Sequence, residues 1–329
     1  MSAPERKTVF SGIQPDGKFH IGNYLGALRN WVRLQDEYDS IYCVVDLHAI
    51  TVPLDRDELH RDRLEAAKVL LAVGIDPDRS LLYYQSQVPQ HTELAWILGT
   101  IASTGQLSRM TQFKEKADKF GANLGLYAYP VLMAADILLF RAQVVPVGED
   151  QTQHLELTRD LAQRFNHRYG EEFPLPEPII PETGARIMSL QDPTAKMSKS
   201  DPDPASRVLV VDDPDTIRDK FKAAVTDSGR DVRYNWEAKP GISNLLEILS
   251  LFTDTPIEQL EREHVETLYA EFKEVVAEAV IDGLAEFRAA YEKLDDEDVA
   301  GIMESGAAAA RDRAEPFLDS VRRRLGLTG

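Results

Sequence analysis

The stretch from Thr8 to Asn23 reads TVFSGIQPDGKFHIGN and opens the first structural unit of the chain. Its apolar beginning, Thr8 to Ser11, predicts a strand that breaks at Gly12. A loop punctuated by glycines follows and leads into a predicted amphipathic helix from Gly22 to Leu34. A strand, a tight loop and a helix in this order form a βα unit, and the free N–H groups at such a helix start favour phosphate.

The same alternation of short apolar runs and longer amphipathic stretches continues to about residue 165. The further predicted strands are Ile41 to Val45, Leu81 to Gln85 and Val144 to Val147, and the further helices are Glu58 to Val73, Thr92 to Ser103, Val131 to Phe140 and Asp150 to Phe165. Strands that alternate with helices through short connections form parallel βαβ units. The sequence therefore predicts an α/β fold with a Rossmann-like, doubly wound parallel sheet, in which ligands bind beyond the carboxyl ends of the strands.

The second half of the chain changes character. Pro174 to Pro214 is rich in proline, aspartate and serine, which predicts a mobile connecting segment. From Gly241 to the end the pattern is helical and contains no predicted strand. We therefore expect a Rossmann-like catalytic domain over residues 1–194 and an all-helical domain over residues 195–329, with the terminal helix from about residue 312 to 329 packing back on the first.

The composition limits the class of protein. Of the 329 residues, 43% are apolar, which is enough for a sizeable core and argues against disorder. The 55 acidic residues outnumber the 37 basic ones and give a net charge of -18, which disfavours non-specific adhesion to nucleic acid or anionic membrane. The one cysteine, Cys43, lies in a predicted buried strand and is interpreted as a core residue. Because no signal peptide or membrane-spanning stretch is visible, we expect a cytoplasmic protein.

A second segment with possible chemistry, Lys196 to Ser200, reads KMSKS and lies 173 residues beyond the first, counting from Asn23 to Lys196. Two lysines three residues apart, with two hydroxyls, form a compact set of donors for an anion. Taken alone, each segment also fits a solvated loop or a structural turn. Together, HIGN at His20 to Asn23 and KMSKS resemble the paired signatures of class I aminoacyl-tRNA synthetases. Asn23 stands where the fuller signature has histidine, a departure that is common in the tryptophanyl branch.

The resemblance extends from Phe10 to about Leu325 and is to the bacterial tryptophanyl-tRNA synthetases in particular. It implies ATP-dependent activation of L-tryptophan to tryptophanyl-adenylate with release of diphosphate, followed by transfer of the tryptophanyl group to tRNA(Trp). It implies Mg²⁺ that is bound through the ATP phosphates, with no metal site formed by the protein. It also implies a homodimer whose helical C-terminal region binds the tRNA anticodon.

Site residues for ATP follow from the same resemblance. The residues that it places on ATP are Gln14, Pro15, Asp16, Gly22, Asn23, Gly148, Glu149, Asp150, Ile187, Lys196, Met197, Ser198, Lys199 and Ser200. Those that it makes catalytic are Lys196, Lys199, Lys116, Gln14 and His20. The resemblance implies that Lys196 and Lys199 hold the diphosphate while negative charge develops on it, with Lys116 as the third lysine.

A candidate pocket for the amino acid is centred on Asp136. An ionisable residue in the middle of an apolar helix is costly unless it is paired, so Asp136 stands out without any resemblance. Indole offers one N–H donor and no acceptor, which calls for a single acceptor between flat apolar walls. The resemblance places Asp136 on the indole nitrogen. It adds as pocket residues Met133, Tyr129, Ile137, Val145, Val147, Gln151, Phe10, Gly12 and His48, although the apolar ones alone would be interpreted as core.

Alternatives remain at this stage. A tyrosyl-tRNA synthetase shares fold and chemistry, a small-molecule nucleotidyltransferase shares the superfold, and a non-catalytic paralogue would serve as a binding module. For an acidic chain, contacts with RNA must be local, and two basic clusters are candidates: Arg159 to Arg168 and Arg322 to Arg324. Each cluster could equally be a solvated helix face.

Overall fold

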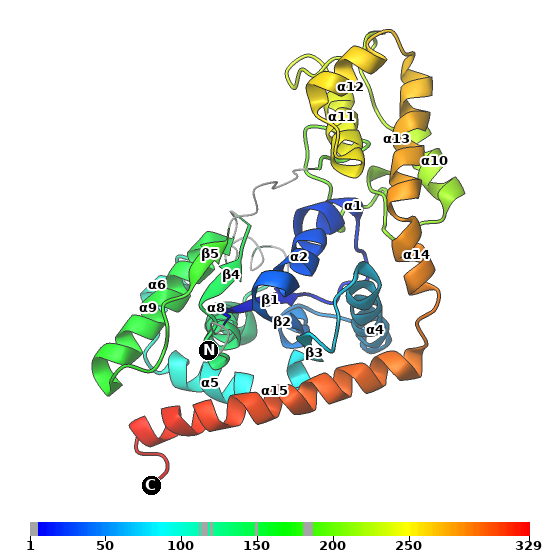
Figure 1. Cartoon of the computed structure of the whole chain (residues 1–329). Coiled ribbons are helices and arrows are strands. Elements are labelled where there is room, and N and C mark those ends of the chain that lie inside the picture. The colour runs from blue at the N-terminus through cyan, green and yellow to red at the C-terminus, as the bar shows by residue number, and fades with distance from the viewer. Residues whose placement is uncertain (1–5, 112, 114–117, 119–120, 149–150, 180–186) are drawn as a thin grey trace.

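The computed structural model describes residues 6–111, 113, 118, 121–148, 151–179 and 187–329. Its centre is a sheet of five parallel strands in the order β3-β2-β1-β4-β5. The strands are β1 (Thr8–Ile13), β2 (Asp39–Val44), β3 (Ser80–Tyr84), β4 (Val144–Pro146) and β5 (Glu177–Ile179). This order turns back between β1 and β4, and the predicted Rossmann-like, doubly wound fold is confirmed (Figure 1).

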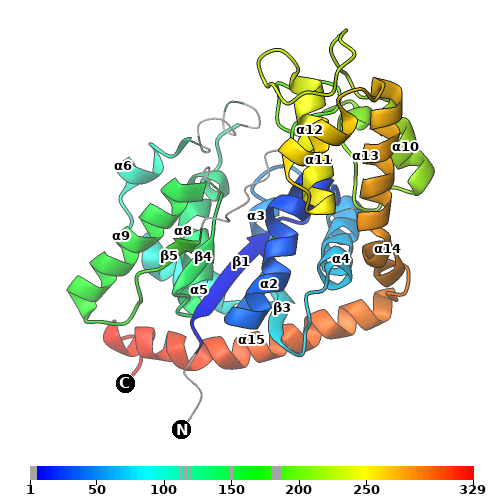
Figure 2. The same ribbon diagram turned by 45° about the horizontal axis from the view of Figure 1, so that its top comes forward.

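Helices cover both faces of the sheet (Figure 2). One face packs on α2 (Arg29–Glu37) and α4 (Arg56–Val73). The other packs on α5 (Gln90–Gly99), α8 (Leu124–Leu139) and α9 (Thr152–Tyr169). The interior strand β2 shows why both faces are apolar: Tyr42 and Val44 belong to the core on the α2 and α4 side, whereas Ile41 and Cys43 belong to the core on the other side.

The short elements sit mostly at strand ends. They are α1 (Ile21–Asn23), the π-helix η1 (Tyr24–Leu28), α3 (Asp46–Ala49), η2 (Gln85–Gln87), α6 (Thr104–Leu107) and η4 (Pro204–Ser206). The helical remainder consists of α10 (Pro214–Ala223), α11 (Pro240–Thr253), α12 (Ile257–His264), α13 (Tyr269–Gly283), α14 (Ala285–Tyr291) and α15 (Asp296–Arg324). In Figure 1, α10 to α13 stand together above the sheet, and α14 leads down from them to α15.

Two sequence-based boundaries are wrong. The first strand does not break at Gly12, because Gly12 pairs in register with Cys43 and the strand runs on to Ile13. A side chain at position 12 would meet Val45, with only 2.8 Å between an added Cβ and Cγ1, which explains the glycine. The stretch predicted as a mere connection also contains the edge strand β5.

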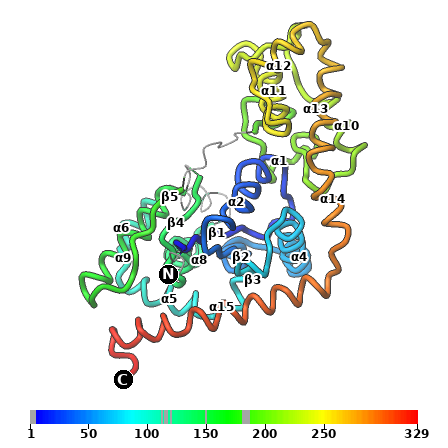
Figure 3. The backbone as a smooth tube through the Cα atoms, viewed as in Figure 1, coloured from blue at the N-terminus to red at the C-terminus, as the bar shows by residue number. Residues whose placement is uncertain are grey.

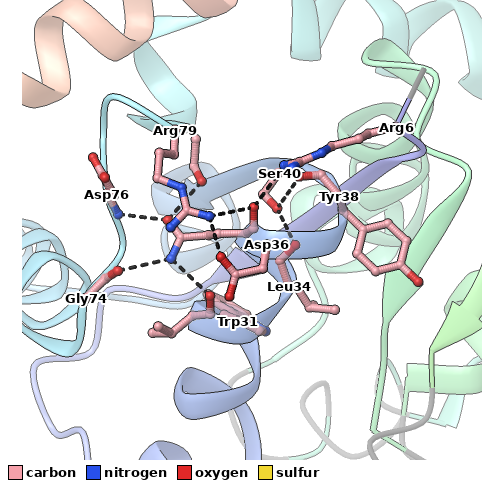
Figure 4. A network of polar contacts seen from close by, with 12 residues as sticks. Arg6, Trp31, Leu34, Asp36, Tyr38, Ser40, Gly74, Asp76 and Arg79 are labelled. Atoms are coloured by element: carbon pink, nitrogen blue, oxygen red, sulfur yellow. Dashed lines mark hydrogen bonds and ion pairs between the residues drawn. The ribbon is translucent and has the colours of Figure 1, made fainter. Parts of the chain in front are cut away.

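A buried glutamine ties α2 to the turn that enters β3. Gln35 donates from Nε2 to the Gly74 carbonyl at 3.0 Å and accepts the Asp76 N–H on Oε1 at 2.8 Å. Its own carbonyl accepts from Arg6 at 3.3 Å and from Arg79 at 3.1 Å (Figure 4). This network fixes the start of β3, and it satisfies backbone groups that would otherwise be buried without partners.

Helix α15 covers the free edge of the sheet. It runs from α14 past α4, β3 and α5 (Figure 3). At Gly306 the helix backbone touches the strand backbone, since an added Cβ would lie 1.9 Å from the Leu82 carbonyl oxygen. Covering an edge strand with a helix is one way in which proteins block unwanted strand pairing.

We expect Gly306→Ala to destabilise the protein by about 2–4 kcal/mol, because the helix must move off β3 to make room for a methyl group. Gly301, in the same helix, provides a matched control, since an added Cβ there meets nothing within 4 Å. Gly301→Ala should stabilise the protein by about 0.5–1 kcal/mol through helix propensity. Urea unfolding of both variants measures the contrast, and equal effects at the two positions would contradict the close contact at β3.

Candidate active site

The two segments that carry the sequence signatures lie against each other. Backbone hydrogen bonds join Val210 N–H to the Phe19 carbonyl at 2.8 Å and Ile21 N–H to the Val208 carbonyl at 2.9 Å. The Lys199 ammonium of the second segment also contacts the Asp16 carboxylate of the first. The fold thus brings together two parts of the chain that the sequence separates widely.

The second segment is anchored by its methionine. Met197 is 2% exposed and packs in the core with Ile187, whose carbonyl accepts the Met197 N–H at 3.0 Å. Ser198 Oγ and Ser200 Oγ lie 3.0 Å apart on the outer side. Alternation of buried and outward residues explains how a mobile-looking loop can present polar groups from a fixed base.

His20 stands at the start of α1 and is buried. Burial and the nearby cations Lys196 and Arg207 lower the pKa of His20 to about 4, so the imidazole is neutral at pH 7. The Asn23 amide oxygen accepts the His20 backbone N–H at 3.1 Å. Asn23 therefore caps the first turn of the helix, a role that the sequence did not suggest. Gly22 leaves room for the imidazole, since an added Cβ would lie 2.9 Å from its Nδ1.

A cavity of about 980 Å³ opens where β1 and β4 diverge, at the turning point of the strand order. All ten predicted tryptophan-pocket residues line this cavity: Phe10, Gly12, His48, Tyr129, Met133, Asp136, Ile137, Val145, Val147 and Gln151. Gln14, Gly148 and Lys199 from the predicted ATP set line it as well. One cavity thus joins the two predicted sites.

The two signature segments hold the ATP residues Pro15, Asp16, Gly22, Asn23, Lys196, Met197, Ser198 and Ser200 and the predicted catalytic residue His20, and Ile187 pairs with Met197. Lys116, Glu149 and Asp150 fall outside the residues that the structure describes.

Asp136 is 1% exposed and is surrounded by donors. Its Oδ2 lies 2.8 Å from His48 Nε2, and its Oδ1 accepts from Gln85 Nε2 at 2.7 Å. His91 Nδ1 lies 2.8 Å from the same Oδ1. Burial alone would raise the pKa of this carboxyl, but His91 and His48 outweigh burial and hold the pKa below its ordinary value. Asp136 is therefore a carboxylate at neutral pH, with its charge turned partly toward the cavity.

The sequence missed several neighbours of the site. Gln85 and His91 stand behind Asp136, and His154 Nε2 lies 2.7 Å from the Tyr129 hydroxyl. A histidine within an apolar helix, such as His91, is the signal that could have drawn attention. Thr111, Gln153 and Glu156 also line the cavity. They looked like ordinary surface polar residues in the sequence.

The predicted basic clusters are largely engaged within the chain. Arg322 donates to Glu93, Glu315 and Asp319, each at 2.6 Å. Arg324 contacts the Glu172 carboxylate. Both arginines pair with carboxylates of the same chain and so help to hold α15 in place.

Comparison with known proteins assigns the family. A family model described as tRNA synthetases class I (W and Y) matches residues 3–285. The chain belongs to this family. It is 53% identical over 322 residues to the tryptophan–tRNA ligase of Caldanaerobacter subterraneus subsp. tengcongensis, covering 98% of both chains. It is 50% identical over 324 residues to that of Halalkalibacterium halodurans, again covering 98% of both.

Solved structures of this synthetase family agree. The tryptophanyl-tRNA synthetase of Mycoplasma pneumoniae is similar with a TM-score of 0.87 and 34% identity, over 98% of both chains. The Campylobacter jejuni enzyme, complexed with ADP and tryptophan, is similar with a TM-score of 0.85 and 34% identity, over 97% of this chain and 99% of that one. The prediction of a bacterial-type tryptophan–tRNA ligase is confirmed. A tyrosyl-tRNA synthetase from Aeropyrum pernix, at 23% identity and a TM-score of 0.65, shares the fold.

None of the described helices is long and apolar enough to cross a membrane. Within the described ranges, no three or more His, Cys, Asp or Glu side chains are grouped so as to hold a metal ion.

His20 makes the stability of the synthetase depend on pH. Its pKa of about 4 in the fold lies below the ordinary 6.5, so the unfolded chain binds more protons between these values and stability falls as pH falls from 6.5 to 4. We expect this residue to account for about 3 kcal/mol of that loss. Urea unfolding of His20→Gln between pH 7 and 4.5 should show a shallower slope than the wild type. His60→Gln, at an exposed site, is the control, and an unchanged slope in His20→Gln would contradict the assignment.

Proposed function

We propose that the 980 Å³ cavity binds L-tryptophan beside ATP and forms tryptophanyl-adenylate there, before transfer to tRNA(Trp). The observation that carries this proposal is Asp136, an ionised acceptor inside an otherwise apolar wall that includes Met133, Ile137 and Val145. An indole needs such a wall and one acceptor, because it has a flat apolar body and a single N–H.

In the first step, a tryptophan carboxylate oxygen attacks the α-phosphorus of ATP. A C–O–P bond forms, the bond to the bridging oxygen breaks, and diphosphate leaves with the electron pair. In the second step, a terminal ribose hydroxyl of the tRNA attacks the activated carbonyl, and AMP leaves. The protein holds the reactants in line and stabilises charge, and these two effects supply most of the catalysis.

The two segments that carry the HIGN and KMSKS signatures form the end of the site that binds the ATP phosphates. Lys199 lines the cavity and reaches Asp16, so its ammonium is held at the boundary between the segments. Phosphate oxygens of ATP compete with Asp16 for this ammonium, and Lys196 and Lys116 add two further cations. The positive end of the helix dipole at the start of α1, beside a neutral His20, favours phosphate in the same region. The loop around Lys199 closes over ATP and opens to release products.

Mg²⁺ enters with the nucleotide in this proposal. It neutralises phosphate charge when bound, and a site made of phosphate oxygens and water suits its octahedral preference.

The tryptophan end is built by three elements. Phe10 and Gly12 come from β1, Val145 and Val147 from β4 and the residue after it, and Tyr129 from α8. These residues and Met133 and Ile137 sandwich the ring, and Asp136 accepts the indole N–H. Gln151, His48 and Tyr129 hold the amino-acid end.

For the macromolecular partner, we propose that residues 195–329, including the KMSKS loop, bind the anticodon arm of tRNA, with residues 1–194 as the catalytic part. We further propose a cytoplasmic homodimer. Trp96 on α5, which is 78% exposed, is a candidate for the contact between the two subunits. Sedimentation equilibrium tests this point, and a monomer at micromolar concentration would contradict it.

ATP–pyrophosphate exchange with tryptophan, tyrosine and phenylalanine in parallel tests the activity, and exchange with tyrosine alone would overturn it. In the same assay, Asp136→Ala should lose discrimination of tryptophan over phenylalanine by about 2–3 kcal/mol, because a buried polar anchor disappears. Asp136→Asn keeps the shape of the side chain and one acceptor oxygen, so its loss should be smaller. Near wild-type discrimination in Asp136→Ala would remove Asp136 from the indole.

Lys199→Ala should slow adenylate formation far more than it weakens tryptophan binding, because the ammonium acts on charge that develops at the diphosphate. Rapid-quench measurement of adenylate formation, paired with tryptophan titration, separates the two effects. Lys222→Ala, on the exposed side of α10, is the matched control. Equal losses of rate and binding in Lys199→Ala would argue against a role in the transition state.

A further inference from the structure

The back of the tryptophan pocket is formed by one short piece of chain. Tyr83 is the residue before the last in β3, Gln85 begins η2, and His91 stands in the first turn of α5. Gln85 and His91 both reach Asp136 Oδ1, at 2.7 Å and 2.8 Å. The cavity itself is lined by Asp136 and His48, which meets the other oxygen, Oδ2. Oδ1 is therefore the anchored oxygen and Oδ2 is the one that serves the cavity.

The proton positions in this group follow from its chemistry. A carboxylate only accepts, so His91 Nδ1 must carry a proton toward Asp136. His91 Nε2 lies 3.0 Å from the Tyr83 hydroxyl. With the proton of the ring on Nδ1, Nε2 is the acceptor and the Tyr83 hydroxyl donates to it; burial also raises the pKa of Tyr83, so the hydroxyl keeps its proton. Tyr83 thus selects the His91 tautomer that donates to Asp136.

Counting acceptor positions shows what remains for a ligand. An ionised carboxylate offers about four acceptor positions. Gln85 and His91 occupy two on Oδ1, and His48 occupies one on Oδ2. One position is left, on the oxygen at the cavity side, and it matches a ligand with a single N–H donor.

We propose that His91, oriented by Tyr83, is a positioning residue for tryptophan selection, because it fixes the Asp136 carboxylate so that one acceptor position faces the indole N–H. This inference rests on the proposed binding of tryptophan in the cavity. His91 is fully buried and does not line the cavity, so it acts through Asp136 and touches no substrate. Without its donor, the carboxylate can turn about its side-chain bond, and the acceptor is no longer aimed.

The decisive experiment compares tryptophan with 3-(benzothiophen-3-yl)alanine, which has the same shape but a sulfur in place of the N–H. In ATP–pyrophosphate exchange, His91→Leu should lower kcat/KM for tryptophan about tenfold, the value for loss of one hydrogen bond to a charged group, mainly through KM. The value for the isostere should change less than about twofold, since it makes no hydrogen bond with Asp136. His91→Asn, whose amide can replace the Nδ1 donor, should recover part of the loss.

A matched pair of tyrosine variants protects the test if His91→Leu fails to fold. Tyr83→Phe removes the donor to His91, whereas Tyr84→Phe removes the hydrogen bond to the Arg63 carbonyl on the other face of β3. Only Tyr83→Phe should lower the preference for tryptophan over the isostere. Equal losses for both substrates in the His91 and Tyr83 variants would overturn the proposal, because a structural defect would explain them. A wild type that fails to prefer tryptophan over the isostere would instead refute the proposed pocket itself.

Discussion

The structure around the tryptophan pocket depends on one constraint, which is the negative charge of Asp136 buried in an apolar helix. Asp136 is 1% exposed in α8, among ten buried residues of that helix. Such a carboxylate is tolerated only with donors on every side, and breaking a buried pair of this kind costs about 3–5 kcal/mol. The donors come from α3, η2 and α5, so these elements must keep a fixed register against α8. The need to pair the Asp136 carboxylate thus constrains how α3, η2 and α5 pack against α8.

The cavity that Asp136 lines lies where the strand order of the sheet reverses, between β1 and β4. These two strands are neighbours in the sheet, and the cavity between them is lined by Gly12 and Val147. Gly12 keeps the cavity open, since a larger residue there would push against Val45. The same edge receives the KMSKS loop through its pairing with the first segment. A charged acceptor and a phosphate-binding loop therefore meet across one opening.

Much of this arrangement could be predicted from local patterns. The alternation of apolar runs gives the parallel sheet, and the spacing of Tyr129, Met133, Asp136 and Ile137 places them on one helix. Other features have no local pattern. Strand β5 is three residues long, includes Pro178 and is largely exposed, so its sequence resembles a loop. The partners of Asp136 lie 88 residues away at His48 and 51 at Gln85, and no sequence spacing shows such contacts.

The C-terminal helix shows why the pocket is not a property of the sheet alone. Arg311 on α15 donates to the Gln87 carbonyl at 2.8 Å, and Gln90 donates to Glu315 at 2.6 Å. These contacts flank the segment that carries Gln85 and His91, and the contact at Gly306 presses on the strand before it. The orientation of a hydrogen-bonded carboxylate depends on how firmly its donors are held. Because α15 contacts the segment that carries Gln85 and His91, it helps to fix the orientation of Asp136. The last helix of the chain therefore helps to shape a pocket whose lining residues all come from the first half of the chain, apart from Lys199.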